Sequence, residues 1–487
     1  MSTMLPKFVL LWTDAVMWAL VVALLVYARV VWRSPNLRAS WTLVFRDAAA
    51  FASAIVLGLC LVLTLLDSIH FRRALPAAST GSPTAAKAYD TRTQSALDSL
   101  LSRQVESREA TYSRPLAYQS FTLESLTVDG EVLRLPPRLL HGGAHLRDPQ
   151  RQWAGDIGAR IAAGLAIGAG AALLLGAWIV LGVARRNGWP WGEALGRVLR
   201  DETDIRWRAA LMMLTVLCLL VGPSALLMND YHLLGTDRTG NDVLYQALKS
   251  IRTAFVIGTL ATVATLPLAV GLGLMAGYFK GWVDEAIQYL YTVLSSVPNV
   301  LLIAACVLMV QVFLDQHPEM FETGAERADL KLFLLCAILG VTGWAGLCRL
   351  LRAEALKLRE LEYVQAATAF GVGPWRIMAR HLLPNVMHLV LITTVLDFSG
   401  LILYEAVLSY VGVGVDPSMN SFGGMINLAR SEMSRDPLVW WSFAAAFGFM
   451  VTVVLAANFF ADGVRDAFDP RARVYRARRA PATGKAG

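Results

Sequence analysis

Three ionisable residues interrupt stretches of sequence that are otherwise apolar. Asp14, Asp397 and Glu405 each lie in a segment long and apolar enough to cross a membrane. Because a charge at the bilayer centre costs roughly 3 kcal/mol or more, such residues indicate either a transport path or a buried structural pair. Asp397 and Glu405 are eight positions apart, near one face of a helix, so both are candidates to line a path for a cationic group. Structural pairing is the alternative for each and is favoured for Glu405.

The motifs of common catalytic and nucleotide-binding sites are missing from the sequence. It contains no HExxH, no GxSxG, no GxGxxG opening a helix after a strand and no GxxxxGKS/T phosphate loop. We therefore expect no catalytic residue, no ATP hydrolysis and no cofactor in this chain. His141 and His145 form a close pair without thiolate or carboxylate partners, which favours a polar loop over a metal site. The five cysteines lie in apolar segments without zinc or disulfide spacing: Cys60, Cys218, Cys306, Cys336 and Cys348.

A polar segment, residues 349–384, has the pattern of a helix, a turn and a second helix. Gly371 marks the turn and Pro374 begins the second helix. Ala366, Ala367 and Gly371 share one helical face, where small side chains let another surface approach closely. Polar residues flank this face: Arg359, Glu362, Gln365 and Arg376. The pattern indicates a contact with a protein partner, and an amphipathic helix lying on anionic lipid is the alternative.

The whole chain has the composition of a multi-pass membrane protein. Of its 487 residues, 56% are hydrophobic and 17% charged, and the mean hydropathy is +0.50. Soluble proteins have roughly 45–50% and about 25%, respectively. The net charge of +7 is too small to indicate a nucleic-acid partner. A membrane-crossing helix needs about 20 apolar residues, and nine stretches qualify: 9–28, 48–66, 161–183, 209–228, 253–279, 286–314, 332–348, 386–411 and 438–461.

Basic residues are distributed unevenly between the segments that join these nine stretches. The segments after the first, third, fifth, seventh and ninth stretches hold 24 Lys and Arg residues, whereas the short segments opposite hold eight. Because positively charged loops stay in the cytoplasm, we expect the N-terminus outside and the C-terminus inside. The long segment 67–160 is left out of this count, since long loops translocate regardless of charge.

Residues 67–156 are the only part with the composition of a soluble domain. Alternating apolar residues on either side of Asp129-Gly130 predict a β-hairpin with a two-residue turn. Residues 94–109 predict a short amphipathic helix. Four apolar residues are expected on one face of that helix: Leu97, Leu100, Leu101 and Val105.

The segment 365–384 resembles the EAA loop of binding-protein-dependent ABC importer permeases. The loop's pattern is EAA, three residues, Gly, nine residues, Ile, any residue, Leu-Pro. This chain matches its spacing throughout, with Gln365 in place of the Glu and His381 in place of the Ile. Glu362, one turn before Gln365, offers a carboxylate on the same face. The resemblance implies contact with an ATPase subunit through Arg359, Glu362, Gln365, Ala366, Ala367, Gly371 and Arg376.

A second segment, 232–244, is similar to a signature of the dipeptide/oligopeptide-type permeases, C-type subunit. That signature reads HxLGTDxxGxDVL and lies just outside the first core helix. Asp242 is expected to cap the helix that follows, and Asn241 stands where Arg is frequent. The matching residues of this external loop are Gly235, Thr236, Asp237, Gly240 and Asp242. Further matches extend the resemblance over about residues 208–471.

The resemblance implies an all-α membrane protein with about nine transmembrane helices. A six-helix type I ABC importer permease core would carry a three-helix N-terminal extension with a small external α+β domain. The expected divisions are helices one and two in 1–66, the external domain in 67–156, the third helix and a cytoplasmic linker in 157–207, the core in 208–471 with its EAA loop at 349–384, and a basic cytoplasmic tail in 472–487.

The function implied is ATP-driven import of peptides or similar small solutes across the inner membrane. The implied partners are a second permease subunit, two cytoplasmic ATPase subunits that bind ATP and Mg, an extracytoplasmic solute-binding protein and membrane lipid. Two alternatives act without ATPase subunits. One is a secondary transporter driven by an ion gradient through Asp14, Asp397 and Glu405, and the other is an envelope scaffold.

Overall fold

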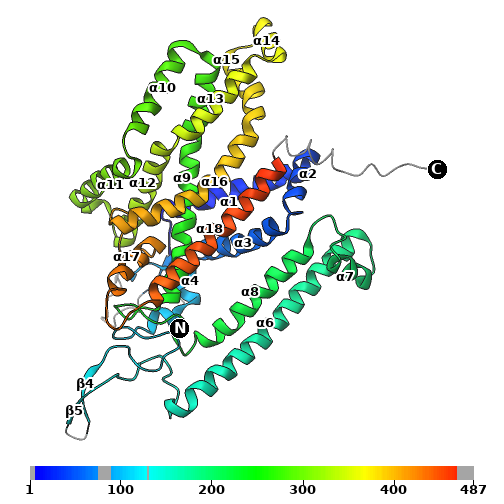
Figure 1. Ribbon diagram of the computed structural model, residues 1–487. Coiled ribbons are helices and arrows are strands. Elements are labelled where there is room, and N and C mark those ends of the chain that lie inside the picture. Colours follow the sequence, from blue (N-terminus) through cyan, green and yellow to red (C-terminus); the bar gives the residue numbers. More distant parts are fainter. Residues whose placement is uncertain (1–5, 75–88, 91, 129–130, 469–487) are drawn as a thin grey trace, which may run out of the picture.

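The computed structural model describes residues 6–74, 89–90, 92–128 and 131–468, most of them helical (Figure 1). Eight of the described helices are long and apolar enough to cross a membrane. A ninth span results if α12 (Gly324–Gly343) and α13 (Ala345–Arg359), bent by 41° relative to one another, count as one. The expected all-α membrane fold with about nine spans is confirmed. The long helices are α1 (Trp12–Arg33), α3 (Ala48–Asp67), α6 (Pro149–Asn187), α8 (Trp207–Leu227), α9 (Val243–Phe279), α11 (Asn299–Gln316), α16 (Leu383–Val411) and α18 (Trp441–Phe468).

One expected span is interrupted. Residues 286–314 belong to two helices, α10 (Gly281–Ser296) and α11, which are separated at Val297 and Pro298. Proline lacks a backbone N–H, so Pro298 ends the first helix and is accommodated just before the second. The short helices are α2 (Pro35–Val44), α4 (Ala96–Leu100), α5 (Ser102–Glu106), α7 (Trp191–Leu199), α14 (Glu362–Ala369), α15 (Pro374–Ile377) and α17 (Phe422–Glu432), with a 3-10 turn at Pro318–Met320 and a π-helical turn at Met378–Leu382.

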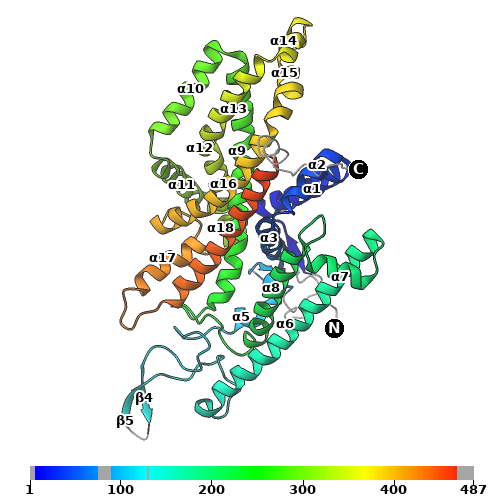
Figure 2. The ribbon, with the colours of Figure 1, turned by 45° about the vertical axis from the view of Figure 1, so that its right-hand side comes forward.

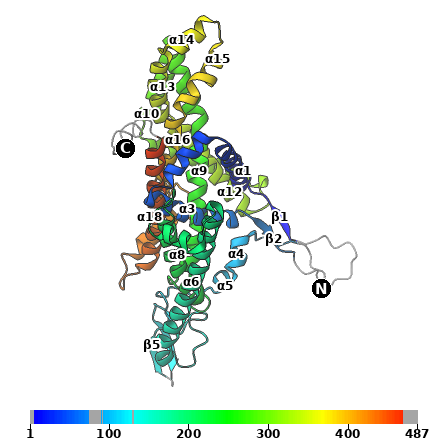
Figure 3. The ribbon, with the colours of Figure 1, turned by 90° about the vertical axis from the view of Figure 1, so that its right-hand side faces the viewer.

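Helix α9 runs through the middle of the molecule, and α3, α12, α13 and α16 pack around it (Figures 1 and 3). Its close approach to α13 depends on two glycines. A Cβ atom at Gly277 would lie 2.5 Å from Ala355 Cβ, and one at Gly273 would lie 2.9 Å from the Cys348 carbonyl oxygen. Both distances are shorter than ordinary carbon contacts, so larger residues here would push the two helices apart.

Helices α1 and α3 are integrated into the core that follows them in the sequence. Met17 of α1 is 2% exposed and packs in one apolar cluster with Val256 of α9. Cys60 of α3 packs in another with Phe255 and Met450. Helices α6 and α8 instead form a pair along one side of the molecule (Figure 2). Two helices of the extension expected in residues 1–207 therefore pack directly on the expected core.

A buried ion cluster joins α1, α9 and α12. The Arg252 guanidinium of α9 lies 2.7 Å from Asp14 Oδ1 and 3.5 Å from Asp329 Oδ1. His70 Nδ1 lies 2.7 Å from the other oxygen of Asp14, and the Thr13 backbone N–H donates to Asp329 at 2.9 Å. Arg252, Asp14 and Asp329 are at most 4% exposed. This pairing supports a structural role for Asp14.

Two small sheets lie on the external segment and its surroundings. In the first, β2 (His70–Arg72) pairs antiparallel with both β1 (Lys7–Val9) and β3 (Gln94–Ser95). The second is the predicted hairpin: β4 (Glu124–Val128) and β5 (Glu131–Leu135) pair antiparallel with Val128 opposite Glu131. Asp129 and Gly130, predicted to form its turn, lie outside the described residues. The hairpin projects from the body at the end opposite α14 and α15 (Figures 1 and 2).

The amphipathic helix predicted over residues 94–109 is wrong. The segment forms β3 and then two short helices, α4 and α5, which meet at Leu101. Only Leu97 and Leu101 are buried, whereas Leu100 is 72% and Val105 43% exposed. The first of these helices begins with a capping box between Ser95 and Asp98, and Lys249 of α9 donates to Asp98 at 2.8 Å.

The ion cluster predicts a large effect of removing its arginine. In the Arg252→Met chain Asp329 would stay buried without its cation and Asp14 would keep only His70, a loss that costs about 3–5 kcal/mol. We expect a marked fall in the melting temperature of the purified, detergent-solubilised chain. Adding Asp14→Asn and Asp329→Asn should recover much of the loss, because no unpaired charge then remains.

The matched control is Arg327→Gln, which removes an exposed ion pair with Asp315. Exposed pairs contribute about 0–1 kcal/mol, so this variant should melt close to the unaltered chain. Equal melting temperatures for Arg252→Met and the unaltered chain, or no recovery in the triple variant, would contradict the structural role of the cluster.

Candidate functional site

The segment 349–384 contains the predicted turn and the second helix, α15, but the expected first helix is divided into α13 and α14, which are separated at Glu360 and Leu361. Helix α14 ends at Ala369 with Phe370 as its C-cap, and Gly371 follows with φ +76°, a left-handed conformation that favours glycine. Pro374 is the first residue of α15, where its fixed φ suits a helix start. The turn therefore follows from the sequence at both of its ends.

Helix α14 is attached to the rest of the chain along one narrow side. Val364 is 1% exposed and enters the apolar cluster formed by α9, α13, α15 and α16. Ala367 and Val372 are half-buried against the same cluster, whereas Glu362, Ala366 and other residues of the helix are exposed. A helix of eight residues with one buried side chain gains little packing stabilisation from the rest of its own chain. Its exposed face is therefore suited to pack on another surface.

Two aromatic side chains of this loop lie uncovered. Phe370 is 88% and Trp375 65% exposed, and they stand on either side of the Gly371 turn. Large exposed aromatic residues mark protein interfaces, where they supply much of the binding energy. We did not identify either residue from the sequence, although two aromatic residues beside glycines in a polar segment were a usable signal.

The polar residues predicted for this contact differ in their placement. Arg359 donates to the Tyr278 carbonyl oxygen at 2.5 Å, and Gln365 donates to the Glu360 carbonyl oxygen at 3.1 Å. Both line a cavity of about 600 Å³ between the end of α9 and α14. Glu362 and Arg376 are exposed, as are Ala366 and Gly371. The structure thus brings these residues to one end of the molecule, with Arg359 and Gln365 bonded to their own chain.

Ion pairs hold the base of this loop. Arg352 of α13 makes two hydrogen bonds to the Asp284 carboxylate of α10, at 2.5 and 2.7 Å. Such bidentate pairs are the strongest of their kind because both donors are fixed in one plane. Lys280 and Glu360 form a second, exposed pair at 2.8 Å. These ion pairs therefore hold the ends of α9, α10 and α13 together where the loop begins.

The two acidic residues of α16 are separated by the structure. Asp397 is exposed on the surface of the helix. Glu405 is 2% exposed and accepts a hydrogen bond from Ser409 Oγ at 2.6 Å. The expectation that both residues face one path therefore fails for Glu405, since eight residues correspond to about 80° beyond two full turns. Asp397 retains a position from which it can face a path or a neighbouring subunit.

The external signature loop, 232–242, is bound to the segment that precedes α6. Gly240 has φ +77°, and a Cβ there would lie 1.8 Å from the Glu109 carbonyl oxygen. Thr236 donates to the Thr111 carbonyl oxygen at 2.8 Å, and Gly235 also has positive φ. Asp237 Oδ1 accepts the Asn241 backbone N–H at 2.9 Å within the loop. The loop is therefore covered by residues of its own chain.

Asp242 and His232 form the buried centre of this contact. Asp242 Oδ1 accepts the Tyr245 backbone N–H at 3.0 Å, which confirms the predicted cap of α9. Its Oδ2 lies 2.8 Å from His232 Nδ1, and Glu109 Oε1 lies 3.4 Å from His232 Nε2. Three backbone N–H groups, those of residues 140–142, donate to the Glu109 carboxylate. Sequence reasoning missed Glu109, whose partners are distant along the chain.

These contacts shift the pKa values of His232 and Glu109. Burial disfavours charge on either group, but the carboxylates of Asp242 and Glu109 outweigh it and raise the pKa of His232 from 6.5 to about 9. For Glu109, burial is likewise outweighed, here by His232 and the backbone N–H donors, and its pKa falls from 4.5 to about 2. At neutral pH the contact is therefore an ion cluster.

These features define a multi-pass membrane protein with two short, largely exposed loop helices, α14 and α15. A family model described as "Binding-protein-dependent transport system inner membrane component" matches residues 269–474. The oligopeptide transport system permease protein OppC of Mycobacterium tuberculosis is 30% identical over 293 residues, covering 58% of this chain and 94% of that protein. The peptidoglycan transport system permease protein YejE of Agrobacterium fabrum is 35% identical over 240 residues, covering 49% and 57%.

The chain belongs to this family of binding-protein-dependent transport system inner membrane components. It is thus a multi-pass inner-membrane subunit of a transport system. Among solved structures, a chain of the MetNI methionine ABC transporter is similar at 17% identity and a TM-score of 0.33, covering 47% of this chain and 96% of that one. That similarity is too low to support an argument.

The His232 cluster predicts a pH-dependent stability. Because its pKa is raised on folding, His232 contributes fully below pH 6.5, and the contribution is lost as pH rises from 6.5 to about 9. Glu109 contributes fully above pH 4.5 and loses its contribution as pH falls towards 2. The melting temperature of the unaltered chain should exceed that of His232→Gln most near pH 5.5, and the difference should shrink by pH 9.

His317→Gln serves as the control, because His317 is half-buried and its Nδ1 lies 2.9 Å from the Phe313 carbonyl oxygen instead of a carboxylate. Its difference from the unaltered chain should stay small and flat over the same range. A His232→Gln difference that is constant from pH 5.5 to 9 would show that the histidine is not held as a cation by its neighbours.

Proposed function

We propose that this chain is the permease subunit of an ATP-driven importer for peptides or related small solutes. The observation that carries the proposal is the uncovered α14–α15 loop, with Phe370 and Trp375 exposed and Val364 anchored in the core. The matched relatives are named for oligopeptide and peptidoglycan transport. Their names support a solute class of peptides or peptide-bearing fragments.

The partners of this mechanism are two ATPase subunits, which bind ATP and Mg, a second permease subunit and an extracytoplasmic solute-binding protein. Closure of the ATPases on ATP would move α14 and α15. Val364 of α14 and Ile377 of α15 are both buried in the cluster that includes Ala355 of α13 and Ala276 of α9. Because packed clusters move as units, displacement of the loop would shift these helices together and switch the opening of the path.

The expected sidedness follows from the positive charges of the connecting segments. In this arrangement α14 and α15 lie at the cytoplasmic end, and the hairpin β4–β5 lies at the external end (Figure 3). Asp397, exposed on α16, would face the second permease subunit or the path between the two subunits.

Phe370→Ala tests the coupling role. Removing a fully uncovered aromatic side chain costs the folded chain little, whereas truncating an interface hot spot costs about 2 kcal/mol or more of binding. In proteoliposomes with all subunits, we expect a fall of at least about tenfold in ATP-driven uptake, with normal membrane insertion. Ala366→Trp should act similarly, since a bulky residue on the exposed face would prevent close docking.

Trp191→Ala is the matched control, because Trp191 of α7 is also exposed, at 49%, and lies away from the loop. It should transport normally. Full ATP-driven uptake by Phe370→Ala would contradict the coupling role. Uptake that needs an ion gradient and proceeds without ATP would instead support the secondary transporter.

Two exposed leucines test the sidedness. Leu140 lies in the expected external segment and is 69% exposed, whereas Leu199 follows the expected cytoplasmic end of α6 and is 53% exposed. Each is replaced by cysteine in a chain without its five native cysteines. An impermeant maleimide added outside intact cells should label position 140 and leave position 199 unlabelled until the cells are lysed. Labelling with the opposite pattern would reverse the topology.

A further inference from the structure

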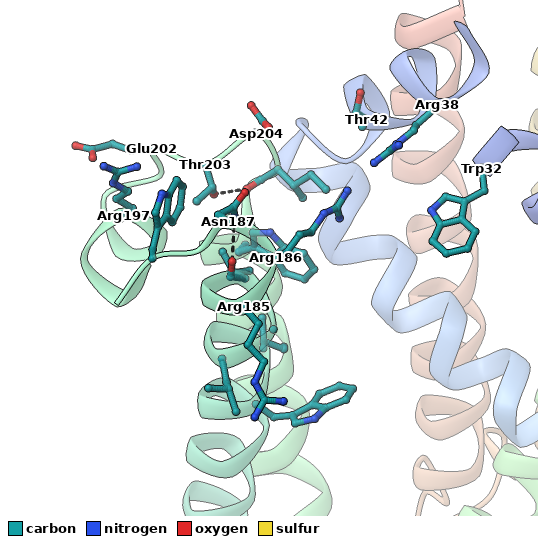
Figure 4. Close-up of a pocket in the computed structure, with 18 of the residues that line it drawn as sticks. Trp32, Arg38, Thr42, Arg185, Arg186, Asn187, Arg197, Glu202, Thr203 and Asp204 are labelled. Carbon is teal, nitrogen blue, oxygen red and sulfur yellow. Dashed lines mark hydrogen bonds between the residues drawn. The ribbon is translucent and has the colours of Figure 1, made fainter. Parts of the chain in front are cut away.

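A large cavity lies between the N-terminal helices and the α6–α7 region, far from the loop of α14. Its volume is about 1270 Å³, above the roughly 300–1,000 Å³ of typical small-molecule pockets. Figure 4 shows α1 and α2 on one side of it, and the end of α6 with the following residues on the other. The expected topology places this cavity at the cytoplasmic surface of the membrane.

The polar part of the cavity is strongly basic. Five arginines line it, against two carboxylates, those of Glu202 and Asp204. Arg197 is committed to Glu193, at 2.5 Å, and to the face of the Trp189 ring, at 4.1 Å. Within the described part of the chain, no Asp or Glu forms an ion pair with the other four arginines, which are Arg33, Arg38, Arg185 and Arg186.

Arginines on opposite sides of the cavity face one another. Arg38 of α2 and Arg186 of α6 extend from opposite sides towards the space between them (Figure 4). Guanidinium groups bind phosphate oxygens through paired hydrogen bonds, and two converging groups can hold one phosphodiester from both sides. The charge of the cavity therefore fits a phosphate anion.

Most of the remaining lining of the cavity is apolar. Trp32 of α1 is 78% exposed and Trp178 of α6 is 74% exposed, with Ile179 and Leu181 beside them. Tryptophan is enriched where membrane helices meet the headgroup region, and helix surfaces below it contact acyl chains. A free anion would leave this part of the cavity unfilled.

We propose that this cavity binds one anionic phospholipid of the cytoplasmic leaflet. Its phosphodiester would lie between Arg38 and Arg186, and its acyl chains would run along Trp32, Trp178 and Leu181. Basic pockets between membrane helices on the cytoplasmic side are suited to acidic headgroups. The lipid would join α1 and α2 to the α6–α8 pair, which otherwise stands beside the core.

The test uses the purified full-length chain in a non-ionic detergent. It is incubated with phosphatidylglycerol, with phosphatidylcholine of the same acyl chains, or with inorganic phosphate. Native mass spectrometry counts the lipid retained, and thermal unfolding measures stabilisation. We expect one retained phosphatidylglycerol, bound at least about tenfold more tightly than phosphatidylcholine, because charge-assisted hydrogen bonds distinguish the headgroups.

Two variants remove different parts of the site. Arg38→Gln with Arg186→Gln should weaken phosphatidylglycerol binding at least about tenfold. The matched control, Arg200→Gln with Arg208→Gln, removes two exposed arginines outside the cavity lining and should bind normally. Gly182→Trp should block the cavity, since a Cβ at Gly182 meets open space, whereas Gly170→Trp on the same helix lies outside the lining and should not.

The proposal would be overturned if the double arginine variant and Gly182→Trp each retained as much phosphatidylglycerol as the unaltered chain. So would equal binding of phosphatidylcholine. Stabilisation by inorganic phosphate that matches phosphatidylglycerol would assign the cavity to a free anion instead. If the double arginine variant does not fold, Gly182→Trp against Gly170→Trp decides the question, because both replace a helical glycine without a steric clash.

Discussion

The pairing of Arg252 is the interaction on which the arrangement of the helices depends. A guanidinium inside an apolar bundle is tolerated only if carboxylates meet it, and α1 and α12 each supply one. These helices must therefore lie beside α9 at that level. Because Asp14 belongs to the N-terminal extension, the same ion pair attaches α1 of the extension to α9.

Helix α9 extends from the Arg252 cluster to the other end of the molecule. There Gly273 and Gly277 let α13 pack closely, and the Tyr278 carbonyl oxygen accepts a hydrogen bond from Arg359. Helix α9 thus connects the region under α14 and α15 to the ion clusters of Arg252 and His232. The loop itself remains incomplete, with Phe370 and Trp375 uncovered, and an ATPase surface would complete its packing.

The sequence predicted the features that depend on local pattern. The length of the apolar stretches predicted the membrane spans, and Gly371 and Pro374 predicted the turn. Asp242 was recognisable as the N-cap of α9. The spacing of the loop gave its resemblance to the family. Each of these signals lies within a few residues of its effect.

Features that depend on distant partners were not predictable. Nothing near Asp14 shows that Arg252, 238 positions away, is its partner, and the same holds for Glu109 and His232. Asp397 is exposed and Glu405 is buried because the two side chains lie about 80° apart around α16 and α16 packs against α17. The break between α4 and α5 at Leu101 was likewise not predicted.

The most direct measurement of the central claim is a cross-link from the uncovered loop to its partner in native membranes. A photoreactive amino acid at position 370, activated by light, should attach this chain to a protein that binds ATP, and the same residue at position 191 should not. The account predicts an ATPase in the product isolated from position 370. A product containing only lipid or a second copy of this chain, from cells in which the subunit is assembled and active, would contradict it.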